Sequence, residues 1–121
     1  SEEGADVMKE DVRTHHETAV LNNLLFMEAV HAKSYSTIFT SLNTTSRIND
    51  IFEWGNNNEM LQYKAKRIND IYQNGNRLQK KIASVFLESF LFYSGFYTPL
   101  YYLGNNKLPN VAEIIKLIIR D

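Results

Sequence analysis

Three residues whose types suit metal and redox chemistry lie at helical spacing in the first third of the chain. Glu28, His31 and Tyr35 are three and four residues apart within residues 22–39, so a helix places them along one face. Their neighbours are mostly apolar, and a charged group in such a stripe is costly unless a partner compensates it. A Glu-x-x-His pair on a helix is half of one known arrangement that holds two metal ions, because the carboxylate and the imidazole reach the same ion.

A second apolar helical segment contains a lone carboxylate, Glu88. A carboxylate from another helix can bridge two ions, and oxygen and nitrogen ligands without sulfur favour iron or manganese. Tyr35 lies one turn after His31, so its ring can approach the same pocket, where a tyrosine beside a redox metal pair can lose an electron and a proton. The residues alone leave two other interpretations open. Glu28 and His31 also suit a polar helix contact or a solvated face, and Tyr35 suits a core position with a bonded hydroxyl.

The elements that must position these side chains are helices. Loop signals occur at Asn43–Ser46, Gly55–Asn58, Asn74–Asn76 and Gly104–Asn110. The intervening segments predict helices over residues 9 or 11–42, 46–54, 59–73, 77–103 and 110–121. No strand alternation competes with them, so the predicted fold class is all-α with about five helices, two of them long.

The helix ends and the long helices give more detailed predictions. Ser46 and Asn110 are predicted N-caps and Gly55 a stop signal, and the 77–103 helix is expected to be disturbed near Gly95 and Pro99. Two apolar seams are expected to face other helices. The first contains Leu21, Leu24, Glu28, His31, Tyr35 and Ile38, and the second contains Leu78, Val85, Glu88, Phe92 and Phe96.

Composition excludes several classes of function. With 121 residues the chain is one domain or part of one, and its 44% hydrophobic content is enough for a core. A net charge of −1 gives no electrostatic support for nucleic-acid binding. The absence of cysteine excludes disulfides, thiolate metal sites and cysteine nucleophiles, and it fits a cytoplasmic protein. Residues 1–17 do not resemble a signal peptide. The apolar stretch between Lys81 and Lys107 contains too many hydroxyl groups to favour a membrane span.

A specific resemblance adds to this interpretation. The segments AVLNNLLFMEAVHAKSYSTIF, ASVFLESFLFYSGFYTPLYYL and NVAEIIKLIIRD resemble consecutive blocks of the small (beta) subunit of class Ib ribonucleotide reductase, covering about residues 11–121. The resemblance implies a ferritin-like helical bundle with a dinuclear manganese or iron centre that generates a tyrosyl radical. It implies an oxidoreductase in which a catalytic alpha subunit uses that radical to make deoxyribonucleotides for DNA replication. It also implies a flavodoxin-like activating protein and a homodimer.

The same resemblance assigns roles to individual residues. Glu28, His31 and Glu88 match metal ligands, and Tyr35 matches the radical tyrosine. Asp121 matches an aspartate that hydrogen-bonds the histidine at position 31 and takes part in radical transfer. That pairing also has a physical reason, because a metal-bound imidazole usually donates its other N–H to a carboxylate.

Two further positions are implied by the resemblance. Ser89 and Tyr93 match positions that line a channel bringing oxidant to the manganese site. A serine and a tyrosine in a helix are also ordinary packing residues.

The sequence departs from the family pattern in its extent. The family's first aspartate ligand should lie just before Ser1, and its second Glu-x-x-His just after Asp121, so three of six ligands are expected here. His15 and His16 offer no substitute, since neither follows an acidic residue by three positions. We therefore expect residues 1–121 to be part of a ferritin-like radical-generating domain, with an incomplete metal site and no activity alone.

Two other classes of protein remain as alternatives. One is another ferritin-like carboxylate-bridged oxidase or iron-binding protein, which would hold metal without a radical on Tyr35. The other is a non-catalytic helical interaction module, which would hold no stoichiometric metal.

Overall fold

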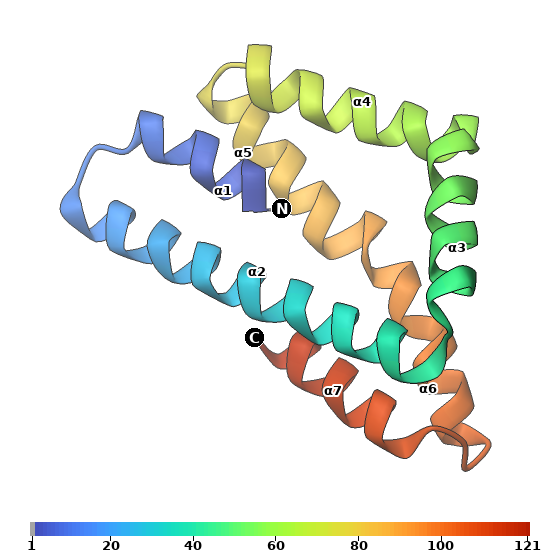
Figure 1. Cartoon of the computed structure of the whole chain (residues 1–121). Helices are drawn as coiled ribbons and strands as arrows, with labels where there is room; N and C mark the ends of the chain where they lie inside the picture. The colour runs from blue at the N-terminus through green and yellow to red at the C-terminus, as the bar shows by residue number, and fades with distance from the viewer. Residues whose placement is uncertain (1) are drawn as a thin grey trace.

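The computed structural model describes residues 2–121, which form helices joined by short loops (Figure 1). The α-helices of this part are α1 (Glu2–Met8), α2 (His15–Leu42), α3 (Thr45–Asn57), α4 (Glu59–Asn74), α5 (Arg77–Phe86), α6 (Tyr97–Gly104) and α7 (Pro109–Arg120). Three short turns of other helix types complete it: 3₁₀ turns η1 (Lys9–Asp11) and η3 (Tyr93–Phe96), and the π-helical turn η2 (Leu87–Leu91). The all-α prediction is confirmed, but the described part has seven α-helices where five were expected.

The long helix α2 begins later than the sequence predicted. Thr14 is its N-cap, and the Thr14 hydroxyl accepts a hydrogen bond from the Glu17 N–H at 3.1 Å. The Glu17 carboxylate in turn accepts from the Arg13 N–H at 2.6 Å, so a start at Lys9 or Asp11 is wrong. Two donors at the helix start are satisfied in this way. His15 and His16 lie exposed in the first turn, as expected.

Three predicted helix ends are also corrected. Thr44 rather than Ser46 caps α3. Gly55 lies inside α3, which continues to Asn57 because the next break is at Asn58, the cap of α4. Asn110 lies inside α7, which begins with Pro109 at its first position; Leu108 precedes it with a φ of 50°.

The predicted 77–103 helix is disturbed near Gly95, as expected, because Gly95 lies in the 3₁₀ turn η3, but its winding already changes earlier. The capping box of Asn76 and Gln79 starts α5, and the π turn follows at Leu87, well before Gly95. Pro99 causes no break, because it lies in the first turn of α6, where a backbone N–H has no helical partner to lose. Glu88 is therefore carried on a π turn rather than on a regular α-helix.

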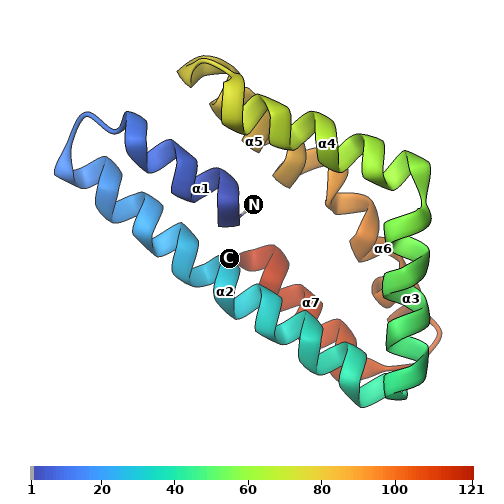
Figure 2. The same ribbon diagram turned by 45° about the horizontal axis from the view of Figure 1, so that its top comes forward.

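The helices form an open frame around α2 (Figures 1 and 2). Helix α1 packs along the first half of α2, and α7 packs along its second half. Helix α3 turns the chain at one end and leads to α4, which pairs with α5. Helix α5 runs in the same direction as α2 on the far side of α1 (Figure 1). The frame brings the end of α7 back to the middle of α2.

The core is small and lies where α1, α4 and α5 meet. Tyr72, Ala83 and Leu87 are buried together, and Ile68, Ile71 and Leu91 pack around them. Gly4 allows α1 to approach closely, since a Cβ at that position would lie 2.5 Å from Tyr72 Cζ. The Tyr72 hydroxyl lies 3.1 Å from Ser84 Oγ. Helix α1 is thus fixed to α4 and α5 by packing and not by its own sequence preference.

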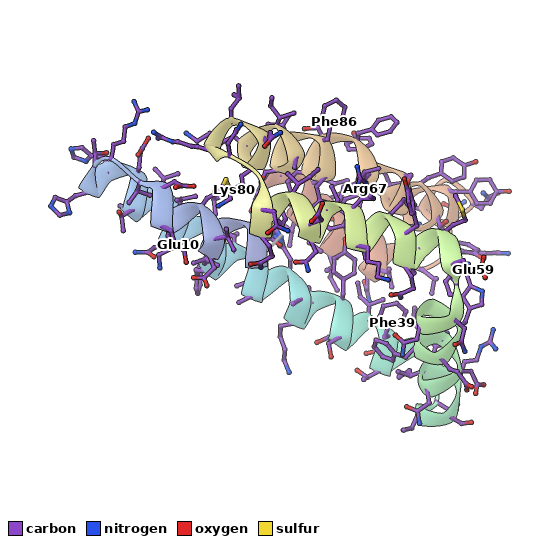
Figure 3. The ribbon with its side chains drawn as sticks, turned by 90° about the horizontal axis from the view of Figure 1, so that it is seen from above. Glu10, Phe39, Glu59, Arg67, Lys80 and Phe86 are labelled. Carbon is purple, nitrogen blue, oxygen red and sulfur yellow. The ribbon has the colours of Figure 1, made fainter. Side chains whose placement is uncertain are left out.

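The first predicted seam is only partly covered, since α2 has no buried residue and Leu24 is exposed, and the second is not buried within the described residues. Leu78 is 66% exposed and Val85 is 63% exposed, while the buried face of α5 carries Lys80, Ala83 and then Leu87 of the π turn. Phe86 also projects away from the other helices (Figure 3). None of the helices in the described part is both long and apolar enough to cross a membrane.

Candidate metal centre

Helix α2 holds Glu28 and His31 one turn apart, as their spacing predicted. His31 Nδ1 lies 4.0 Å from Glu28 Oε1, and both side chains are mostly buried. A separation of 4.0 Å is too long for a hydrogen bond. Two bonds of about 2.0–2.2 Å to one divalent ion, at a tetrahedral or octahedral angle, need the two atoms about 3.0–3.5 Å apart, a difference that rotation of the side chains can close. The pair can therefore share an ion without a change of backbone.

The other nitrogen of the same imidazole faces the end of α7. His31 Nε2 lies 3.5 Å from Asp121 Oδ2, and it is a buried nitrogen without a hydrogen-bond partner in the described part of the chain. Asp121 is held there because its N–H donates to Leu117 O at 3.1 Å, which continues the α7 turn. The arrangement leaves Nδ1 directed to Glu28 and Nε2 to Asp121, the division of roles expected of a metal-bound imidazole.

Besides partial burial, the negative charge of Glu28 contributes to raised pKa values at both Glu88 and Tyr35. Partial burial raises the pKa of the Glu88 carboxyl, and the negative charge of Glu28 raises it further, although Glu88 as a residue remains exposed. Partial burial also raises the pKa of the Tyr35 phenol, again with a contribution from Glu28. Like charges that oppose each other in this way are typical of carboxylates that share a cation.

The two predicted channel residues lie on the outer side of the same segment. Ser89 is exposed within the π turn. Tyr93 is 59% exposed, and its ring meets Phe96 edge to face at 5.6 Å. Neither has an observed contact with Glu28 or His31, so their role in a channel stays a prediction.

The donor set fits a divalent metal in chemistry and is incomplete in number. Among residues 2–121, no three acidic, histidine or cysteine side chains gather closely enough to hold an ion. Glu28 and His31 make up a two-ligand half-site, with Glu88 close enough to interact electrostatically. Carboxylate and imidazole donors without thiolate suit manganese or iron.

Comparisons with known proteins identify the family of the chain. The family model described as ribonucleotide reductase, small chain, matches residues 1–121. The chain belongs to the ribonucleotide reductase small-chain family. The family model and the relatives confirm the resemblance that the sequence blocks predicted.

Individual relatives of this small chain are similar along almost all of it. The beta subunit nrdF1 of Mycobacterium tuberculosis ribonucleoside-diphosphate reductase is 54% identical over 98% of this chain and 37% of its own length. The ribonucleoside-diphosphate reductase 2 subunit beta of Escherichia coli is 52% identical over the same shares. The crystal structure of dimanganese(II)-NrdF from Streptococcus sanguinis has a TM-score of 0.92 and 70% identity over 98% of this chain and 42% of that one. The chain thus spans little more than a third of the length of the curated relatives it matches.

Sequence reasoning missed one group of charged residues in this small chain. Lys80 is buried and paired with Asp11, and Arg77 is paired with Glu17. The sequence signal was Lys80 itself, because it shares a helix face with the apolar residues Ala83 and Leu87. A cation buried on that face requires an acidic partner.

Proposed function

We propose that this chain carries the radical-generating half of a metal site in the beta subunit of ribonucleoside-diphosphate reductase. The observation that carries the proposal is the position of His31, whose Nδ1 faces Glu28 and whose buried Nε2 faces Asp121. A histidine in a plain helix contact has no need of carboxylates on both nitrogens. In this proposal residues 1–121 form part of a ferritin-like radical-generating domain.

Each side chain has a distinct task in the proposed site. Glu28 and His31 bind one ion of a dinuclear manganese or iron centre, and Glu88 binds from the π turn. In the proposed site, the Asp121 carboxylate accepts a hydrogen bond from His31 Nε2–H. This hydrogen bond fixes the tautomer that leaves Nδ1 free to bind metal. Asp121 also provides the link through which the radical leaves toward the partner subunit.

Tyr35 is the proposed radical residue. When bound, the metal pair supplies the oxidising equivalent that removes one electron from the phenol. Because the pKa of Tyr35 is raised by burial, the phenol is protonated at neutral pH and releases its proton as the electron leaves.

The proposed partners follow from the activity. A catalytic alpha subunit takes up the radical and reduces ribonucleotides to deoxyribonucleotides, and a flavodoxin-like protein delivers the oxidant that activates the metal pair. Ser89 and Tyr93 are proposed to line the path of that oxidant. The assembly is proposed to be a cytoplasmic homodimer of the small chain.

The test is electron paramagnetic resonance on the full-length, metal-loaded and oxidised protein. Tyr35→Phe should abolish the radical signal while the metal content stays at the wild-type level. Tyr63→Phe, on an exposed tyrosine of α4, is the matched control and should keep the signal. A radical that persists in Tyr35→Phe would refute the assignment of Tyr35 as the radical residue. Failure of the wild-type protein to bind metal would refute the proposed metal site.

A further inference from the structure

Two ion pairs tie the start of α5 to the segment that begins α2. Arg77 Nη2 lies 3.2 Å from Glu17 Oε1, and Lys80 Nζ lies 3.5 Å from Asp11 Oδ2. The Lys80 side chain is only 11% exposed, and Figure 3 shows it between the N-terminal helices and the start of α5. A cation so far removed from water is stable only with its partner in place. We call these four residues the register clamp.

Glu17 and Arg77 of the register clamp precede the candidate ligands by the same number of positions. Glu28 follows Glu17 by eleven positions on α2, and Glu88 follows Arg77 by eleven positions along α5 and the π turn η2. On α2, eleven positions are about three turns of α-helix, so Glu17 and Glu28 lie close to one face; on the other segment, α5 gives way to the π turn just before Glu88. The two helices run in the same direction (Figures 1 and 2). An ion pair at one end therefore sets which residues meet three turns later.

Apart from the register clamp, helix α1 connects the two helices at this end, because it packs against both α2 and α5. A cavity of about 370 Å³ lies between the two helices at this end, with Val20 and Leu21 of α2 on one side and Arg77 and Lys81 of α5 on the other. Helix α1, not α5, packs closely along the first half of α2. Where apolar side chains do not interdigitate, helix packing does not determine the axial position, and long charged side chains must bridge the space.

We propose that the Glu17–Arg77 ion pair, supported by Asp11–Lys80, sets the axial register of α5 against α2 and so places Glu88 opposite Glu28. The inference rests on the proposed function for the meaning of that carboxylate pair, but the register itself is a property of the helices. Arg77 is then a positioning residue for the metal site, three turns away from any metal ligand.

The register can be measured directly because the chain has no cysteine. Spin labels on cysteines introduced at exposed positions, Ala32 on α2 and Val85 on α5, report the spacing of the helices by pulsed dipolar spectroscopy. Arg77→Met should shift the distance by about 1.5 Å or more, one residue of helical rise, or broaden its distribution. Arg77→Lys, which keeps the charge, should restore much of the wild-type distribution. An unchanged distribution in Arg77→Met would overturn the proposal.

The matched control is Lys81→Met. Lys81 lines the same cavity and its positive charge also acts on Glu17, but it makes no ion pair in the described part of the chain, so its removal should change the distance much less than Arg77→Met. A shift as large as that of Arg77→Met would show that charge near the cavity matters and the pair does not. If Arg77→Met fails to fold by circular dichroism, the labelled wild type in 1 M salt gives the same test, since salt screens the part-exposed pair. An unchanged distance there would count against the clamp.

A second measurement separates this inference from the proposed function. Binding of Mn²⁺ to the full-length protein, followed by the loss of the free-ion resonance signal, should weaken severalfold in Arg77→Met and stay unchanged in Lys81→Met. Wild-type protein that binds no Mn²⁺ would overturn the proposed function, and the distance data would still decide the clamp. A shifted distance with wild-type Mn²⁺ affinity would refute the positioning role.

Discussion

Replacing Ile115 with alanine should loosen α7 and draw Asp121 away from His31. Ile115 is 2% exposed and, with Ala112 one turn earlier at 0%, forms the buried face of α7. Asp121 follows directly after this helix, so its 3.5 Å approach to His31 Nε2 depends on how α7 sits on α2. The packing of one isoleucine is thereby connected to the geometry of the candidate site.

The expected cost can be worked from burial. Ile115→Ala removes three carbons from a dry position, at about 0.8 kcal/mol each, and the remaining cavity brings the total to roughly 3 kcal/mol. Ile119→Ala removes the same atoms from the same helix, where the side chain is 38% exposed. It should cost roughly 1.5 kcal/mol, because part of the surface was never buried and little cavity forms. The gain in helix propensity is the same in both variants and cancels.

The measurement is urea unfolding followed by circular dichroism, with hydrogen exchange of the α7 amides as a local readout. Ile115→Ala should lose about 1.5 kcal/mol more than Ile119→Ala, and the Asp121 amide, which donates to Leu117 O, should exchange faster. Equal losses in the two variants would refute the packing of α7 described here. A large loss with unchanged exchange in α7 would refute the link to Asp121.

Three further predictions concern the site and the core. Glu28→Ala or Glu88→Ala should remove most of the metal from the full-length protein, and unchanged content by elemental analysis would count against the ligand assignment. Glu88→Gln should stabilise the metal-free chain near neutral pH and have no advantage at acid pH. The raised pKa of Glu88 means that the folded state holds its proton more tightly than the unfolded state, so wild-type stability falls as pH rises through that pKa; parallel pH profiles for the two proteins would contradict it. Gly4→Ala should cost about 1–3 kcal/mol, because the new Cβ meets the buried Tyr72 ring. Gly95→Ala, where a Cβ meets nothing within 4 Å, should cost much less in the same thermal unfolding assay.

Sequence reasoning succeeded where one helix carries the whole pattern. Glu28 and His31 lie three residues apart, so any α-helix brings them together, and helix periodicity was sufficient to predict it. Asp121 is distant in sequence, and only the resemblance to a known family placed it beside His31. The raised pKa values of Glu88 and Tyr35 depend on partial burial and on Glu28, and spacing alone predicts neither.

The errors in the fold have tertiary causes. Helix α1 was missed because its polar sequence contains a glycine, and that glycine is what allows it to pack against Tyr72. The winding of the fourth predicted helix changes at Leu87, where no glycine or proline marks it, while Pro99 fits a first turn. The second seam was assigned from apolar spacing, but Lys80 lies on the buried face because Asp11 compensates its charge.

The electrostatics of the site explain why a distant clamp can matter. Without a cation, the negative charge of Glu28 disfavours ionisation of Glu88, a smaller contribution to the raised pKa of Glu88 than its partial burial. A divalent cation reverses the sign of that interaction, but it can bind only where both carboxylates are already within reach. Attraction between Glu17 and Arg77, three turns away, holds the helices together before metal arrives. The register clamp therefore holds the two carboxylates within reach of one cation, and metal affinity should depend on both ends of the two helices.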